Sequence, residues 1–231
     1  MIKELIQDTL SIFYPQLCAA CNDLLVRGED TICTKCNVQL PYTNYHLDPD
    51  NPVAKQFWGK IKLESASAFL HFHKGEKVQQ LMHQLKYAHR PDVGVYIGKL
   101  CGQSFAASQV FSKVDVIIPI PLHKKKERIR GYNQAACFSD GLGLGMGIES
   151  LPHGMKRLKH TDTQTRKSRF ARYKNVSEVF AVTDSKAIEG KHILLVDDVI
   201  TTGSTLYACA NVLLEVKDVK IYLAAIAFAE L

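Results

Sequence analysis

The segment of residues 193–205, ILLVDDVITTGST, constrains the fold of this chain more than any other part of the sequence. Its apolar residues form a strand pattern that leads into two adjacent acids, Asp197 and Asp198. A short loop of hydroxyl residues with one glycine follows, and a helix is expected to begin near Ser204. Other strand patterns alternate with helix patterns along the chain, which implies an α/β fold with a mainly parallel sheet covered by helices on both faces. In such sheets, ligands bind beyond the carboxyl ends of the strands.

The loop after the two acids has the chemistry of a monophosphate site. Gly203 allows the backbone to turn and to approach a phosphate closely. Backbone amides at the helix N-terminus donate hydrogen bonds to such an anion, as do the hydroxyl groups of Thr201, Thr202, Ser204 and Thr205. Carboxylates do not attract phosphate, so the expected partners of the two acids are sugar hydroxyls or a metal ion that bridges to a diphosphate. A ribose 5-phosphate unit suits both parts of this segment, because its hydroxyls would pair with the two acids and its phosphate with the loop. The alternative is a capped helix after a core strand with two incidental acids.

Apolar spacing predicts the other elements. Strands are expected over 66–72, 114–118, 192–196 and 219–226, and a second helix over 93–111. An earlier helix carries Val78, Leu81, Met82 and Leu85 on one face. The stretch 141–147 has glycine at every second position but fits no dinucleotide-binding motif, and it is interpreted as a loop that ends the preceding helix.

Three prolines among polar residues in the segment 41–52 indicate a domain boundary. We expect residues 1–58 to form a small N-terminal module that opens with an amphipathic helix over 1–13, and residues 59–231 to form the main domain. No apolar stretch resembles a signal peptide or reaches membrane-spanning length. The expected location is therefore the cytoplasm, without membrane insertion.

Four of the seven cysteines lie within twenty residues and form two C-x2-C pairs separated by eleven residues. The four are Cys18, Cys21, Cys33 and Cys36. Each pair brings two thiolates together at one tight turn, and two pairs complete a tetrahedral zinc site with no open position for catalysis. A structural zinc ion is the prediction, since it would fold a segment too small to be stable on its own core. Redox or catalytic roles are the alternative.

Positive charge is concentrated in two segments. Residues 124–130 contain five Lys or Arg and one acid, and residues 156–174 contain eight and one, within a net charge of +6. Such focused charge favours a polyanionic ligand, either a phosphorylated small molecule or nucleic acid. Solvated surface faces are the alternative.

The run 193–205 resembles the binding motif for phosphoribosyl pyrophosphate (PRPP) of type I phosphoribosyltransferases, in which two acids and two apolar residues precede TTGST. By this resemblance Asp197 and Asp198 hold the ribose 2- and 3-hydroxyls and act as catalytic residues. Residues 201–205 bind the 5-phosphate, and Mg²⁺ accompanies PRPP.

A second motif, residues 119–134, follows a predicted strand and runs from PIPLH into KKKERIRGYNQ. Together with the four-cysteine module it resembles the ComF family, whose founding members are competence proteins of DNA uptake, over essentially the whole chain. The resemblance implies that the pyrophosphate group meets the segment around Pro121, His123 and Lys124, with Arg128 and Arg130 nearby.

Lys86 and the segment 158–176 can each be interpreted in two ways. Lys86, at the end of a predicted helix, looks like a family feature that could reach the diphosphate, or it is a cation placed at a helix C-terminus by the helix dipole. Residues 158–176 resemble the lid that closes over PRPP in this fold, or they form a basic surface loop.

The sequence supports two functions. One is transfer of phosphoribose from PRPP to an acceptor that the sequence does not identify. The other is a non-catalytic, PRPP-responsive protein that binds single-stranded DNA and acts with the DNA-uptake machinery, using the clustered bases. The sequence identifies neither the acceptor substrate nor the oligomeric state.

Overall fold

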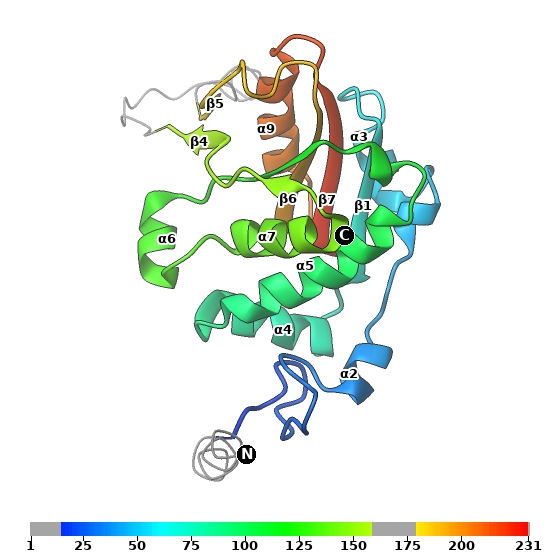
Figure 1. The fold of residues 1–231 in the computed structure, drawn as a ribbon, viewed down its shortest axis with the longest axis vertical. Helices are drawn as coiled ribbons and strands as arrows, with labels where there is room; N and C mark the ends of the chain where they lie inside the picture. The colour runs from blue at the N-terminus through cyan, green and yellow to red at the C-terminus, as the bar shows by residue number, and fades with distance from the viewer. Residues whose placement is uncertain (1–14, 159–178, 231) are drawn as a thin grey trace.

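The computed structural model describes residues 15–158 and 179–230. Its centre is a sheet in which five strands lie in the order β1-β7-β6-β2-β3, with every neighbouring pair parallel (Figure 1). The strands are β1 (Ser65–His71), β2 (Val116–Pro119), β3 (Glu149–Ser150), β6 (His192–Ile200) and β7 (Lys220–Phe228). A separate antiparallel pair is formed by β4 (Met155–Arg157) and β5 (Phe180–Val182). The predicted parallel sheet is confirmed.

Helices cover both faces of the sheet and form two apolar layers. One layer packs α4 (Lys77–Tyr87), α5 (Pro91–Ala106) and α7 (Gln134–Met146) against one face. The other packs α3 (Pro52–Phe57) and α9 (Ser204–Leu214) against the opposite face. The remaining elements are α2 (Thr34–Val38), η1 (Tyr45–Leu47), η2 (Phe111–Lys113) and α6 (Lys124–Arg130).

Strand β6 shows why its sequence is continuously apolar. Leu194 and Val196 belong to the layer of α4, α5 and α7, whereas Ile193 and Leu195 belong to the layer of α9. Because successive side chains of a strand point to opposite faces, a strand covered on both sides needs apolar residues at every position.

The glycine-rich stretch lies inside a helix, so its interpretation as a loop was wrong. Gly141, Gly143 and Gly145 belong to α7, and Gly147 ends the helix in the left-handed conformation with φ of +72°. Facing glycines on α5 explain Gly141 and Gly145 of this pattern. A Cβ atom built on Gly98 would lie 2.9 Å from the Cα atom of Gly141, closer than real side chains allow. The low helix propensity of glycine is offset here by the close approach of two helix backbones.

The other expected elements lie at the predicted positions, but some of them differ in length from the prediction. The four apolar residues expected on one helix face are all buried in α4. The helix expected over 93–111 ends at Ala106 and is followed by the short η2. The helix expected over 1–13 and most of the segment 158–176 lie outside the described residues. Within the described ranges, no helix is both long and apolar enough to span a bilayer.

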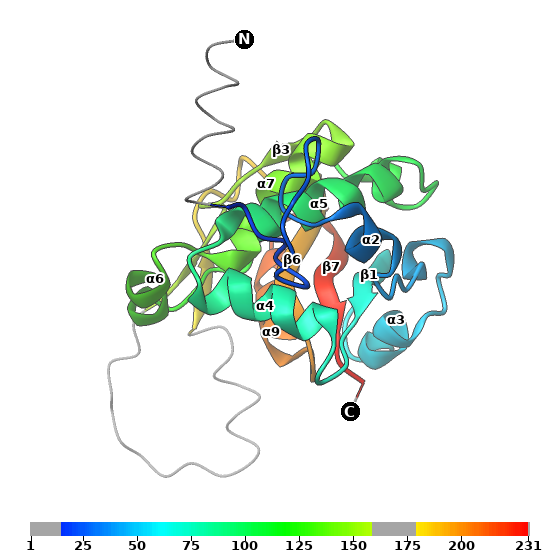
Figure 2. The same ribbon diagram turned by 90° about the horizontal axis from the view of Figure 1, so that it is seen from below.

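The cysteine-containing segment packs directly on the helical layer. Cys18, Cys33 and Cys36 share one buried cluster with Leu81 of α4 and Val93 of α5. Figure 2 shows this segment, in blue, crossing the outer side of α4 and α5. The segment therefore shares its core with the helices that cover the sheet.

Replacing Gly98 by alanine should destabilise the protein by roughly 1–3 kcal/mol or more, because the added methyl group overpacks the contact between α5 and α7. Urea unfolding of Gly98→Ala measures the loss. Gln103→Ala, an exposed position on the same helix, serves as the control and should change stability little. Equal stabilities of the two variants would contradict the close-packing explanation.

Candidate functional site

The two acids lie where β6 extends beyond its neighbour. The last register pair between β2 and β6 joins Pro119 to Val196, while β6 itself continues to Ile200 beside β7. Asp197 and Asp198 therefore lie within the strand, on the part that passes the carboxyl end of β2. The backbone N–H of Asp198 donates to Oδ1 of Asp197 at 2.8 Å, which fixes the orientation of that carboxylate.

Helix α4 brings a lysine to the second acid. The Nζ atom of Lys86 lies 2.9 Å from Oδ2 of Asp198. Their side chains are only 22% and 18% exposed, so the pair is partly shielded from solvent. The position of Lys86 at the last turn of α4 also matches the favoured placement of a cation near a helix C-terminus. Lys86 therefore lies in the last turn of α4 and pairs with an acid, while its expected contact with a diphosphate stays a prediction.

Asp197 has the most unusual ionisation in this part of the structure. Burial, followed by the negative charge of Asp198, raises the pKa of Asp197 to about 7. The N–H of Asp198 and the charge of Lys86 oppose this rise without cancelling it. Near neutral pH the carboxyl group of Asp197 is thus present in both its protonated and its ionised form.

The hydroxyl-rich loop follows directly and leads into α9. Gly203 has φ of +69° and occupies the N-cap position of α9 without a side-chain capping hydrogen bond. The hydroxyl oxygens of Thr202 and Ser204 lie 2.6 Å apart, and Ser204 begins the helix. The predicted order of strand, acids, loop and helix is therefore present, with donors gathered at a positive helix end.

The loop after β2 lies beside the acids. The N–H of Ile120 donates to the carbonyl of Val196 at 2.9 Å, so Pro121 leaves the sheet next to Asp197. His123 caps α6, and its Nδ1 accepts a hydrogen bond from the N–H of Lys125 at 3.2 Å. Lys124 is exposed at the start of α6. No contact described here joins His123 or Lys124 to the acids, so the structure places them in the adjoining loop and helix only.

Arg130 connects α6 to α4. Its guanidinium lies 5.6 Å from the ring centroid of Tyr87 and donates to Oε1 of Gln134 at 2.6 Å. Tyr87 also packs at 5.2 Å from the ring of His83. Arg130 is therefore held beside the residue that follows Lys86, at the rim of the site.

A hollow of about 380 Å³ adjoins the pair of Lys86 and Asp198. Its walls come from α4, from the ends of β6 and β1, and from the residue after β7. They include Phe72, Met82, His83 and Tyr87. Sequence reasoning did not select Phe72 or His83, because only the fold brings the end of β1 to α4.

Sequence reasoning also missed Gln56. Its Nε2 atom donates to the carbonyl oxygen of Thr201 at 2.6 Å, across 145 positions of sequence. No motif signals this contact, since Gln56 lies in a short helix without a recognisable pattern.

The four cysteines form a candidate metal centre. Their Sγ atoms all lie within 4.8 Å of one another, and the Sγ atoms of Cys21 and Cys33 lie 3.8 Å apart. Tetrahedral zinc with Zn–S distances of about 2.3 Å requires sulfur atoms about 3.8 Å apart, so the cluster could hold zinc. Cys18 is the cysteine of this cluster whose pKa is lowered. Burial raises the pKa of its thiol, but hydrogen bonds from the N–H groups of Cys33, Ala20 and Cys21 together outweigh this effect. The resulting pKa is about 7.

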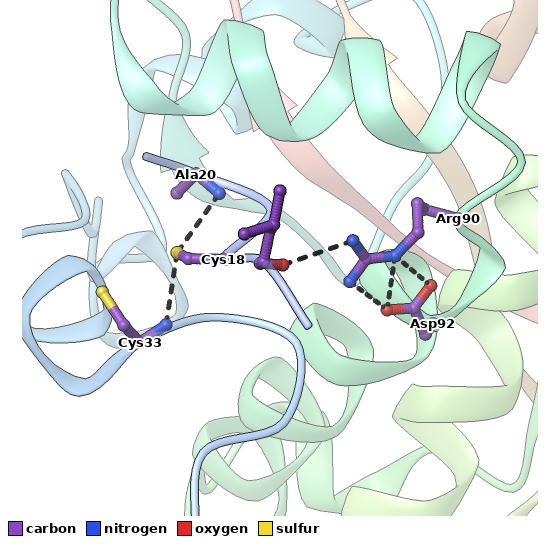
Figure 3. A network of polar contacts seen from close by, with 6 residues as sticks. Cys18, Ala20, Cys33, Arg90 and Asp92 are labelled. Carbon is purple, nitrogen blue, oxygen red and sulfur yellow. Dashed lines mark hydrogen bonds and ion pairs between the residues drawn. The ribbon is translucent and has the colours of Figure 1, made fainter. Parts of the chain in front are cut away.

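Figure 3 shows how the cysteine centre is tied to α5. The Sγ atom of Cys18 accepts hydrogen bonds from the N–H groups of Ala20 and Cys33, at 3.4 and 3.3 Å. Next to it, Arg90 donates to the carbonyl of Leu17 at 3.4 Å and pairs with Asp92 at 2.8 Å. The four-cysteine cluster therefore lies in a segment that is attached to the N-terminal end of α5.

Comparison with known proteins agrees with this architecture. Residues 153–229 match the family model described as phosphoribosyl transferase domain. The chain is 39% identical to competence protein F of Haemophilus influenzae over 111 residues, which cover 47% of this chain and 48% of that protein. It is 37% identical to competence protein ComFC of Bacillus subtilis over 113 residues, 47% of this chain and 44% of that protein. It is 26% identical to DNA utilization protein YhgH of Escherichia coli (strain K12) over 202 residues, 86% and 84% of the two chains. The match thus spans about half the length of the two competence proteins.

The raised pKa of Asp197 predicts a pH-dependent effect of Asp197→Asn on stability. Because the pKa in the folded state lies above the unfolded value, the folded protein binds more protons, and this stabilisation is lost as pH rises through about 7. Asparagine has no charge to bury. The variant should therefore differ least from the wild type near pH 4, the ordinary pKa of an aspartate, and exceed it by on the order of 1–3 kcal/mol near pH 8.5. Urea unfolding at both pH values measures this, and a difference that does not grow with pH would contradict it.

Proposed function

We propose that this chain, which is similar to competence protein F over about half its length and matches the phosphoribosyl transferase domain over residues 153–229, binds PRPP at the carboxyl end of β6. One observation carries this proposal. Two acids at an open sheet edge lead directly into a glycine loop at the N-terminus of α9. The acids suit ribose hydroxyls, and the loop suits a phosphate monoester.

In this proposal the residues divide by the part of PRPP that they bind. Asp197 and Asp198 accept hydrogen bonds from the ribose hydroxyls. The backbone and hydroxyl groups of residues 201–205 hold the 5-phosphate. Positive charge on the pyrophosphate side comes from Lys86, Lys124 and Arg130, with Pro121 and His123 shaping the loop between β2 and α6. Mg²⁺ bound together with PRPP supplies further positive charge to the diphosphate.

The reaction that such a site supports is displacement of pyrophosphate at C1 of the ribose by an acceptor nucleophile. The acids would fix the ribose ring, and the bases would stabilise negative charge on the departing diphosphate. The hollow beside Lys86 and Asp198 leaves space next to the ribose position. Pyrophosphate release from PRPP, measured with nucleobases, ammonia and single-stranded DNA as acceptors, tests whether the protein turns PRPP over.

Asp197→Asn combined with Asp198→Asn should weaken PRPP binding about a hundredfold or more, because two charged hydrogen-bond acceptors are lost. Titration calorimetry with Mg²⁺ present measures the affinity. The control, Glu189→Gln with Glu215→Gln, removes the same charge from exposed positions near the amino ends of β6 and β7. Equal affinity of the two double variants would refute the ribose assignment.

We also propose that the four cysteines bind structural zinc. The purified protein should contain about one zinc ion per chain, since four thiolates complete its coordination. Cys33→Ser should lose the metal and melt at a lower temperature, because the segment packed on α4 and α5 depends on it. Metal analysis and thermal unfolding check both effects. Unchanged metal content in Cys33→Ser would argue against this ligand set.

Binding of single-stranded DNA is the second candidate function, and the exposed face of α6 favours it. Lys124, Lys125 and Lys126 are exposed, and Arg130 lies over the exposed ring of Tyr87. Clustered bases beside an aromatic ring suit a phosphate backbone and a stacked base. Two relatives are named for competence and for DNA utilization, which favours a role in DNA handling. In this proposal the protein acts with the DNA-uptake machinery in the cytoplasm.

Replacing Lys124, Lys125 and Lys126 by glutamine should weaken binding of a labelled single strand about tenfold or more and reduce its salt dependence, since fewer counterions are released. Fluorescence anisotropy at several salt concentrations measures both. If the wild-type protein does not bind the strand even at low salt, this candidate is wrong.

A further inference from the structure

The short helix α3 contacts the loop that follows the two acids. The carbonyl oxygen of Thr201 accepts a hydrogen bond from Nε2 of Gln56 at 2.6 Å. The neighbouring residue, Phe57, is 2% exposed, and its ring lies against Gly203. A Cβ atom on Gly203 would come within 2.6 Å of Cζ of Phe57. Two adjacent residues of α3 therefore touch both ends of the turn from Thr201 to Gly203.

Helix α3 is itself fixed to the sheet. Asn51, fully buried, donates from Nδ2 to the carbonyls of Ala66 and Asp48 at 2.8 and 2.7 Å. Its Oδ1 accepts from the N–H of Ala54 at 3.0 Å and so caps the helix. Since Ala66 belongs to β1, the position of α3 is set by the same sheet that carries the acids. The contact at Thr201 is thus made from a rigid support.

The direction of this hydrogen bond matters because of peptide geometry. In a trans peptide, the C=O and N–H of one unit point in opposite directions. The described backbone contains no cis peptide. When Gln56 holds the carbonyl of Thr201 toward α3, the N–H of Thr202 in the same peptide unit must point away from α3. It then faces the opposite side of the loop.

The other end of the Gln56 side chain is unusual. Its Oε1 atom is buried and has no hydrogen-bond partner among the described residues. It lies 3.5 Å from the place of a Cβ on Gly203. Buried polar atoms are almost always paired, so an unpaired one indicates a constraint other than stability. Here the amide is held in place by its contact with the loop.

We propose that Gln56 is a positioning residue for the phosphate loop: it holds the carbonyl of Thr201 so that the N–H of Thr202 is aimed at a bound phosphate monoester. Phe57 supports the same turn and leaves room only for glycine at position 203. This inference rests on the proposed binding of PRPP and adds a contact from outside the motif.

The test compares two ligands that use different parts of the site. Ribose 5-phosphate engages the loop, whereas pyrophosphate with Mg²⁺ engages the basic side near Lys86. Gln56→Met keeps the side-chain volume and removes the donor. It should weaken ribose 5-phosphate binding roughly threefold to tenfold, the value of one hydrogen bond, and leave pyrophosphate binding within about twofold. Gln103→Met, the same change at an exposed position on α5, should alter neither.

A second variant separates positioning from a general loss of packing. Gln56→Glu keeps the shape but replaces the donor by a negative charge near the phosphate. It should bind ribose 5-phosphate more weakly than Gln56→Met at low salt, and the difference should narrow as salt screens the repulsion. If residue 56 lay far from the bound phosphate, the affinities of these two variants for ribose 5-phosphate would not differ in a salt-dependent way.

The outcomes are distinct. A selective loss for ribose 5-phosphate in Gln56→Met supports the proposal. Unchanged affinity for ribose 5-phosphate, or equal loss for both ligands, overturns it while leaving the proposed PRPP site standing. Failure of the wild-type protein to bind either ribose 5-phosphate or PRPP overturns the proposed function and this inference together.

Discussion

The candidate site exists because β6 is longer than the neighbouring strand β2. Pairing between the two strands stops at Val196, and the next residues of β6 keep only β7 beside them. The acids occupy the open edge that results, together with the loop that leaves β2. Each other part of the site is arranged around this edge, since α4, α6 and α9 all present one end to it.

Burial gives the edge its electrostatic character. Burial, followed by the negative charge of the neighbouring Asp198, raises the pKa of Asp197 to about 7. Lys86 offsets part of this charge by pairing with Asp198. A ligand with hydroxyl groups and phosphates would find acceptors, a cation and helix donors within a short distance. The same arrangement makes ligand binding and protonation of the acids dependent on each other.

The layers on the two faces of the sheet hold the helix ends that form the site in place. Close packing between glycines of α5 and α7 brings two helix backbones together under the sheet. The cysteine segment covers the outer side of α4 and α5 and shares their apolar cluster. Helix α3 lies on the opposite face and contacts the loop that follows the two acids through Gln56. Residues before β1 thus contribute to both faces, although the expected boundary after residue 58 assigns them all to one module.

The sequence by itself determined the parallel sheet, the two acids that follow the apolar residues 193–196, the glycine loop before α9 and the four converging thiols. These features are encoded by neighbouring residues, because apolar periodicity, turn chemistry and metal-ligand spacing act over a few positions. Only the tertiary structure decided that Lys86 meets Asp198 and that Gln56 meets Thr201, since both contacts join segments more than a hundred residues apart. It also decided that glycines 141, 143 and 145 lie in a helix. The backbone of α5 faces Gly141 and Gly145, whereas Ile148 and Ser150 face Gly143, and no local sequence pattern indicates these neighbours.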